Sequence, residues 1–227
     1  MKLLIGVPAY NEENVIGKVL KNLPRKISGI SKIDILVVND GSSDETEKLA
    51  EKISGVIVLN HLINRGLGGA LKTILTYAKM KNYDLLITFD ADGQHISNDV
   101  VKLINTYYSS NTDVVIGSRW KRSLHKPFSR YLVNQFANFF TFLLFAVWTS
   151  DSQSGLRLFN KKAINCIDLE TDGMEVSSEI FKEIKRKKLS FSETSITAIY
   201  TKYSLKKGQQ VSNSINVIIQ LLLRLIK

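Results

Sequence analysis

The sequence predicts an α/β fold in which a mostly parallel sheet is covered by helices on both faces. Short runs rich in β-branched residues, bounded by Gly, Asn or Asp, alternate with stretches of helical periodicity along the first half of the chain. Strand and helix repeated in this way pack as parallel strands with helices on both sides. The 227 residues are 44% hydrophobic, which is enough for a substantial core and excludes a largely disordered chain.

The elements are expected in the following order. The β-branched runs place strands at 2–7, 33–39, 56–60, 84–90 and 113–118, and further strands follow at 154–160 and 190–200. The periodic stretches place helices near 11–23, 43–54, 67–81, 97–109, 128–148 and 175–188, and a last helix ends the chain. Ser42 and Glu45 have the spacing of a capping box at the start of the second helix.

The net charge of +10 comes entirely from the second half of the chain. Residues 1–115 hold 13 basic and 13 acidic residues, whereas residues 116–227 hold 18 and 8. Such a field attracts an anionic partner: nucleic acid, an anionic membrane surface or a phosphorylated substrate. The single Cys166 excludes an internal disulfide and a cysteine-based zinc cluster. No run reaches the roughly 18 to 20 apolar residues that span a bilayer, so a membrane-spanning segment is not expected. Contact with a membrane surface is not excluded.

The residues just after each strand form the expected site, because ligands of such sheets bind beyond the carboxyl ends of the strands. Asp90 and Asp92 follow the fourth strand with only Ala91 between them. Two carboxylates so spaced can share a hard divalent cation, Mg²⁺ or Mn²⁺, and leave coordination positions for phosphate oxygens. Gln94 or His95 would add a ligand or support one. The alternative is that Asp90 only caps the helix that follows.

Short motifs between residues 8 and 157 occur in the order known from one enzyme family. With these motifs the chain resembles the family 2 glycosyltransferases of the GT-A fold, in particular the dolichol-phosphate mannose synthase and polyprenyl-phosphate glycosyltransferase branch. The motifs are Pro8-Ala9-Tyr10-Asn11-Glu12-Glu13, Asn39-Asp40-Gly41-Ser42-Ser43-Asp44, Asn64-Arg65-Gly66-Leu67-Gly68-Gly69-Ala70, Asp90-Ala91-Asp92-Gly93-Gln94-His95, Gly117-Ser118-Arg119 and Asp151-Ser152-Gln153-Ser154-Gly155-Leu156-Arg157.

The resemblance implies a nucleotide-sugar site in the first half of the chain. The residues that it assigns to the donor are Pro8, Ala9, Tyr10, Glu12, Asp40, Asn64, Arg65, Asp90, Ala91 and Asp92. The metal that bridges the donor diphosphate would be held by Asp90, Asp92 and Gln94. Neutralising the charge of the departing nucleoside diphosphate would then be the main catalytic effect. The glycines at 66, 68 and 69 are explained first by a tight turn from strand to helix.

Two acceptor chemistries stay open on the other side of the site. If the acceptor is a sugar hydroxyl, a carboxylate must take its proton, and Asp151 is the candidate. If the acceptor is a lipid phosphate, no base is needed, and Arg119 with Arg130 would form a cationic clamp. Asp151 would in that case orient Arg119 or Arg157, which is also an acceptor-binding candidate. The remaining alternative is an Asp151 that only caps or forms a salt bridge.

Two helices carry more apolar surface than a core stripe needs. The stretch 131–148 is rich in Phe and follows the basic segment 119–130, which suits docking at an anionic membrane interface as well as a place in the core. The helix at 215–226 has one polar stripe on an apolar cylinder, so homodimer packing and membrane binding are both open. We expect a GT-A domain at 1–200, with a nucleotide-sugar half to about 118 and an acceptor half from about 119, and then a basic loop and amphipathic helix at 201–227.

The leading hypothesis is a metal-dependent inverting glycosyltransferase that moves a hexose from a GDP- or UDP-sugar to a polyprenyl phosphate or lipid-linked acceptor. We expect it in the cytoplasm, peripheral on the inner face of the cell membrane, because the first residues lack the apolar length of a secretory signal. An alternative is transfer to a saccharide hydroxyl in cell-surface polysaccharide or glycan synthesis. A haloacid-dehalogenase-like phosphatase fits Asp90 to Gly93 but not Gln94.

A non-catalytic basic nucleic-acid-binding module is the alternative from another class, prompted by a pI of about 9.6. Nucleic acid is nevertheless not expected as a partner, because Asp90 and Asp92 would repel phosphate unless a metal were bound.

Overall fold

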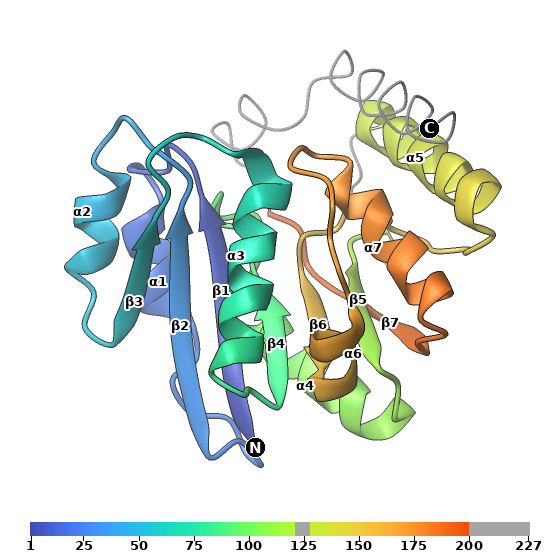
Figure 1. Ribbon diagram of the computed structural model, residues 1–227, viewed down its shortest axis with the longest axis horizontal. Coiled ribbons are helices and arrows are strands. Elements are labelled where there is room, and N and C mark those ends of the chain that lie inside the picture. The colour runs from blue at the N-terminus through green and yellow to red at the C-terminus, as the bar shows by residue number, and fades with distance from the viewer. Residues whose placement is uncertain (121–127, 200–227) are drawn as a thin grey trace.

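One sheet of seven strands runs through both halves of the chain in the computed structural model, which describes residues 1–120 and 128–199, with the backbone only at 128–130 (Figure 1). The strand order is β3-β2-β1-β4-β6-β5-β7. β6 runs antiparallel to β4 and β5, and the other neighbours are parallel, so the expected mostly parallel sheet is confirmed. The strands are β1 (Lys2–Ala9), β2 (Lys32–Asn39), β3 (Val56–Asn60), β4 (Leu85–Thr88), β5 (Val114–Ser118), β6 (Arg157–Asn160) and β7 (Phe191–Ser195).

The helices follow the expected order with one addition, α6, which directly continues β6. In the described part of the chain, no helix is long and apolar enough to cross a bilayer. The expected basic loop and C-terminal helix at 201–227 lie outside the described residues. The helices are α1 (Ile16–Asn22), α2 (Thr46–Glu51), α3 (Gly66–Met80), α4 (Asn98–Ser110), α5 (Phe128–Phe145), α6 (Lys161–Cys166) and α7 (Val176–Arg186).

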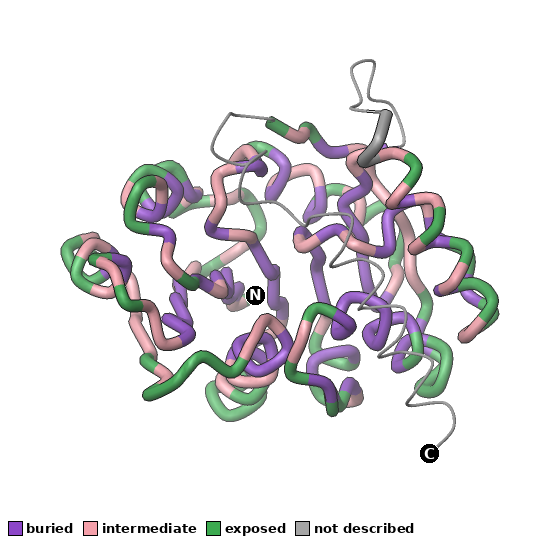
Figure 2. The backbone as a smooth tube through the Cα atoms, turned by 90° about the horizontal axis from the view of Figure 1, so that it is seen from above, coloured by how far each residue is buried: buried purple, intermediate pink, exposed green. Residues whose placement is uncertain are grey.

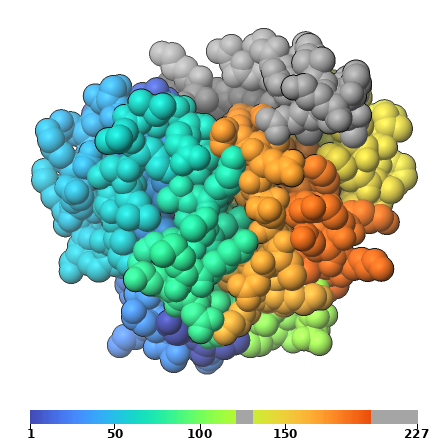
Figure 3. Space-filling view, viewed as in Figure 1, coloured from blue at the N-terminus to red at the C-terminus, as the bar shows by residue number. Residues whose placement is uncertain are grey.

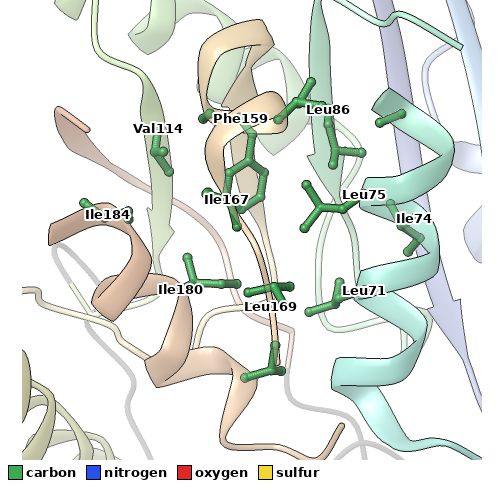
Figure 4. Close-up of a cluster of buried hydrophobic side chains, with 14 of the residues drawn as sticks. Leu71, Ile74, Leu75, Leu86, Val114, Phe159, Ile167, Leu169, Ile180 and Ile184 are labelled. Atoms are coloured by element: carbon green, nitrogen blue, oxygen red, sulfur yellow. The ribbon is translucent and has the colours of Figure 1, made fainter. Parts of the chain in front are cut away.

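Helices cover both faces of the sheet because successive side chains of each strand point to opposite faces. On β4, Leu86 joins a hydrophobic cluster with α3, α6 and α7, whereas Leu85 and Ile87 join a second cluster with α1, α2 and α4. Figure 4 shows the first cluster, where Leu75 and Ile180 lie on either side of the sheet residue Phe159. Burial is highest along the strands and falls toward the outer turns of the helices (Figure 2).

The expected capping box at the start of α2 is wrong. The helix begins at Thr46, the side chain of the preceding Glu45 makes no capping hydrogen bond, and the Asp44 carboxylate accepts the Thr46 N–H at 3.0 Å. The Ser42 hydroxyl instead accepts a hydrogen bond from the Asn11 N–H at 2.9 Å, and the Ser43 N–H donates to the Asn11 side chain at 2.9 Å. These contacts tie the loop after β2 to the loop after β1, so Ser42 serves this long-range contact and does not cap α2.

The carboxyl ends of β1 to β5 share one edge of the sheet, which we call the site edge (Figure 1). The loops that follow these strands lie at this edge, and α5 follows β5 there (Figure 1). Because β6 is antiparallel, the segment 149–156 that leads into it reaches the same edge. The topology therefore brings the expected donor residues and the expected acceptor residues to one place.

Candidate active site at the carboxyl edge of the sheet

Asp90 lies at the centre of the site edge, because β4 sits between β1 and β6 in the sheet. β4 ends at Thr88, two residues earlier than expected, so Asp90 belongs to the loop. His95 Nε2 donates to the Asp90 carboxylate at 3.2 Å. Gly155 packs directly against both carboxylate oxygens, and any side chain at position 155 would overlap them. The Thr88 hydroxyl donates to the Gly155 carbonyl at 2.7 Å, which fixes that close approach.

Asp92 is held by Gln94 within the turn that follows β4. The Gln94 N–H donates to one Asp92 oxygen at 2.9 Å, and the Gln94 side-chain amide donates to the other at 2.7 Å. Gly93 between them has a positive φ of 74°, a conformation that glycine adopts without strain. Of the three residues expected to hold a metal, Asp92 and Gln94 are thus in direct contact, and the charge of Asp90 acts on Asp92. In the described part of the chain, no three His, Cys, Asp or Glu side chains form a metal cluster by themselves.

The two carboxyls of the pair have opposite pKa shifts. Burial opposes ionisation of Asp90, but the hydrogen bond and electrostatic attraction from His95, with the positive charges of Arg119 and Arg157, outweigh it and lower the Asp90 pKa. Burial raises the pKa of Asp92, and the negative charge of Asp90 raises it further. Glu12 adds to that rise, which places its charge near Asp92 as well. The site edge therefore holds an excess of negative charge around Asp92.

Arg119 and Asp151 form a bidentate ion pair beside this acid pair. Arg119 Nε and Nη2 donate to the two Asp151 oxygens, each at 2.8 Å, and the Arg119 N–H donates to one of them at 3.0 Å. The Asp151 side chain is fully buried, whereas 16% of the Arg119 side chain stays exposed. Asp151 therefore orients Arg119, which was one of the roles expected for it. The side chain of Arg130 lies outside the described residues.

Arg157 is completely buried beneath the site edge, because β6 occupies the middle of the sheet. Its Nη2 donates to the carbonyls of Ser152 at 2.8 Å and Ser177 at 3.3 Å. Burial lowers the pKa of Arg157 to about 10, against the opposing effect of Asp90 and Asp151. Arg157 still carries its charge at neutral pH. From this position its positive charge lowers the pKa of Asp90. Its side chain is too buried to contact an acceptor.

Asp40 fixes the loop that carries Asn64 and Arg65. Its carboxylate accepts the N–H groups of Arg65 at 3.0 Å and Gly66 at 2.7 Å. His61 Nδ1 lies 2.6 Å from the same carboxylate, and His61 Nε2 lies 2.8 Å from the Thr73 hydroxyl of α3. Asp40 is therefore engaged within the protein, and the exposed side chains of Asn64 and Arg65 project from the loop that it holds.

The residues expected around the nucleotide base line the loop after β1. Ala9 is buried and Pro8 is half-buried at the end of the strand, and Tyr10 is 45% exposed. Glu12 is buried, and its N–H donates to the Thr46 hydroxyl at 2.7 Å. The loop thus offers an exposed aromatic ring next to a buried carboxylate. Ala91, between the two acids, is buried.

The glycines at the start of α3 contact the second half of the chain, which the sequence did not indicate. The Asp172 carbonyl accepts the N–H groups of Gly68 at 2.7 Å and Gly69 at 3.2 Å, and so caps the helix. A side chain at Gly68 would overlap the Thr171 carbonyl. Glu179 of α7 holds this segment by accepting the N–H of Thr171 at 3.0 Å. The amides of this helix end are therefore engaged by the protein itself.

A first prediction follows from that close approach. Gly68→Ala is expected to destabilise the protein by about 1–3 kcal/mol, because the new methyl group forces the segment at 171–172 away from α3. Gly17→Ala in α1 is the matched control, because a methyl group there meets nothing within 4 Å. We expect it to stabilise the protein by roughly 0.5–1 kcal/mol. Chemical denaturation of both variants checks the pair, and equal effects would contradict the packing described.

Comparison with known proteins gives a family and a fold. The family model described as Glycosyl transferase family 2 matches residues 4–168. An uncharacterised protein of Methanocaldococcus jannaschii is 41% identical over 228 residues, which is 98% of this chain and 92% of that protein. A UDP-N-acetylglucosamine–dolichyl-phosphate N-acetylglucosaminyltransferase of Methanococcus voltae is 34% identical over 238 residues, which covers 96% and 93% of the two chains.

The crystal structure of glucosyl-3-phosphoglycerate synthase from Mycobacterium tuberculosis, in complex with Mn²⁺, UDP and glucosyl-3-phosphoglycerate, has the same fold. It matches with a TM-score of 0.72 at 17% identity, covering 97% of this chain and 77% of that one. The expected GT-A architecture is thereby confirmed.

Proposed function

We propose that this chain, which belongs to glycosyl transferase family 2, transfers a hexose from a nucleotide diphosphate sugar to a polyprenyl phosphate or a related lipid-linked acceptor. The observation that carries the proposal is the buried Asp151 that grips Arg119 with both carboxylate oxygens. A carboxylate so engaged is poorly placed to take a proton, whereas the guanidinium that it orients has the planar, charged form that suits a phosphate. The relative from Methanococcus voltae, named for a dolichyl-phosphate acceptor, supports the same acceptor class.

The donor would lie along the site edge between Tyr10 and Asp92. Tyr10 offers an exposed ring to the base, and Glu12 a carboxylate to a sugar hydroxyl. Asn64 and Arg65 would contact the donor from the loop that Asp40 holds. UDP-sugars and GDP-sugars are both candidate donors.

A divalent cation, Mg²⁺ or Mn²⁺, fits the residues present. Asp90, Asp92 and Gln94 supply only oxygen ligands once the Gln94 amide turns its oxygen toward the cation, and these are the ligands that both ions prefer. Burial raises the pKa of Asp92, and the negative charges of Asp90 and Glu12 raise it further, so a bound cation would favour the ionised carboxylate. When bound, the cation neutralises charge on the diphosphate. His95 would keep Asp90 oriented from below.

The acceptor would approach from the side of Arg119 and Arg130. A phosphate anion needs no general base, and an inverting transfer requires only that its oxygen be held opposite the leaving diphosphate. Arg119, fixed by Asp151, would hold that oxygen, and Arg157 would keep the local field positive from beneath. The second candidate, transfer to a saccharide hydroxyl, requires Asp151 to release Arg119 and accept a proton.

Contact with the cytoplasmic face of the cell membrane belongs to the proposal. Leu132, Phe136, Phe139 and Leu143 of α5 are exposed along one face at helical spacing, and Trp148 beyond the helix adds to them. An exposed apolar face of this extent marks an interaction surface. Together with the basic residues that precede α5 in the sequence, it suits the anionic interface where a polyprenyl phosphate resides.

The test is a panel of nucleotide sugars incubated with the protein, Mn²⁺ or Mg²⁺ and polyprenyl phosphate, with the product identified by mass. We expect one sugar to appear as a polyprenyl phosphate adduct. Transfer to added saccharides with an unchanged lipid phosphate would support the second candidate. Binding of oligonucleotides that weakens with salt and ignores Asp92→Ala, without any transfer, would favour a nucleic-acid-binding module.

A further inference from the structure

The loop between β3 and α3 exposes two large aliphatic side chains beside the donor site. Leu62 is 102% exposed and Ile63 is 72% exposed, so both lie largely in solvent. The loop is nevertheless fixed at both ends by Asp40, because His61 and the Arg65 N–H both contact its carboxylate. The His61 N–H also donates to the Asn39 carbonyl at 2.9 Å. A loop held in this way presents the two apolar side chains to the outside of the molecule.

A chain of contacts connects this loop to α5 along the site edge. The first turn of α3 touches the segment at 171–174 through Gly68 and Asp172, and Met174 of that segment is also exposed, at 41%. That segment leads into α7, which contacts α5 through Ser178 and Thr141, at 3.4 Å. The strand order places β3, which precedes this loop, at one end of the sheet and β5, which precedes α5, next to the other end, and in Figure 3 the teal segment lies to the left of the yellow α5. The acid on this path, Asp172, is neutralised by Lys72 at 2.6 Å.

We propose that Leu62 and Ile63 insert into the membrane interface and form a second anchor, at the opposite end of the site edge from α5. The inference rests on the proposed lipid-linked acceptor, which brings a bilayer to this edge. Two protruding apolar patches with a polar site between them fit a flat apolar partner. A bilayer with anionic lipids also matches the basic second half of the chain, which includes α5 and carries the whole net charge of +10, and the exposed Arg65 adds a positive charge two residues from Ile63. Anchoring at both ends would hold the loop that carries Asn64 and Arg65 and the region around Arg119 at the same depth in the membrane interface.

A fluorescent probe at position 62 tests the insertion without any substrate. In a Cys166→Ser background, Leu62→Cys and, as the matched control, Met80→Cys carry an environment-sensitive fluorophore. Met80 is 77% exposed at the far end of α3, away from the site edge. With vesicles of phosphatidylglycerol and phosphatidylcholine, we expect a blue shift at position 62, quenching by spin-labelled lipids there, and neither effect at position 80. A probe at position 62 that stays in water while the protein sediments with the vesicles would overturn the proposal.

Partition measurements with unlabelled protein test whether binding to vesicles is lost when the two side chains are removed. Leu62→Ser combined with Ile63→Ser should weaken binding to the same vesicles by about tenfold or more, because two aliphatic side chains no longer leave water. Met80→Ser should leave the binding unchanged. Light scattering without lipid provides the other outcome: a dimer that the double substitution dissociates would assign this loop to a second copy of the chain and overturn the membrane anchor.

The vesicles contain no polyprenyl phosphate and no nucleotide sugar, so these results are independent of the transfer reaction. Transfer by the double variant to a short, water-soluble polyprenyl phosphate separates the two proposals. Retained transfer with lost vesicle binding supports the anchor. Absent transfer in the wild-type protein contradicts the proposed function, while a position-62 probe that still enters the bilayer keeps the anchor.

Discussion

Asp92→Asn is expected to lower kcat/KM for sugar transfer by about 100-fold or more, because the site then loses the charge that holds a cation against the diphosphate. The same change should remove the Mn²⁺-dependent rise in melting temperature that UDP or GDP gives the wild-type protein. The amide that replaces the carboxylate is close in size, and the neighbouring Gln94 N–H keeps an oxygen acceptor. The fold should therefore survive, and melting without ligand should change little.

Asp84→Asn is the matched control for this experiment. Asp84 lies just before the opposite end of the same strand, β4, where it accepts the Lys2 N–H at 2.7 Å. Its charge is remote from the site edge, so transfer and nucleotide protection should stay near wild-type values. Full metal-dependent protection in the Asp92→Asn protein would contradict the proposed metal site, whatever the activity shows.

Arg119→Ala is expected to cause the second large loss, in both activity and stability. Removing the guanidinium leaves the fully buried Asp151 carboxylate without its cation, which costs about 3–5 kcal/mol in comparable buried pairs. Arg119→Lys keeps a positive charge but cannot form the bidentate contact with Asp151. We therefore expect a stability between those of Arg119→Ala and the wild-type protein, and a raised KM for the lipid phosphate. Denaturation and steady-state kinetics on the same preparations check both effects.

Asp151→Asn decides between the two acceptor chemistries through the pH profile. If Asp151 only positions Arg119, the rate falls while the dependence of kcat/KM on pH keeps its shape. If Asp151 is a general base, the acidic limb of that profile disappears with the carboxyl. We expect the first result. A vanished acidic limb, together with transfer to a saccharide hydroxyl, would contradict the lipid-phosphate acceptor.

The central part of this site was predictable from sequence because residues that follow parallel strands all lie at the same end of the sheet. Asp40 and Asp90 follow strands that both pair in parallel with β1, and Arg119 follows β5, which runs in the same direction on the other side of the antiparallel β6. The spacing of Asp92 and Gln94 is local, so their contact within one turn follows from the chain itself.

The features that sequence did not predict depend on partners distant in the chain. Arg157 was expected at the acceptor, but the insertion of β6 into the middle of the sheet buries it. The glycines at the start of α3 allow Asp172 to come close to the helix, and Gly155 allows close contact with Asp90. The residues next to these glycines in the sequence do not indicate either partner. His61 had no signal beyond its position after β3, although it braces Asp40.

The most direct test of the account is a crystal of the protein soaked with Mn²⁺ and a nucleotide sugar, with the metal located by its anomalous scattering. We predict manganese in contact with Asp92 and with the diphosphate, and the Gln94 amide turned away from the Asp92 oxygen that it now contacts. A nucleotide sugar bound at the site edge with manganese absent or elsewhere, and Asp92 still bound to the Gln94 amide, would contradict it.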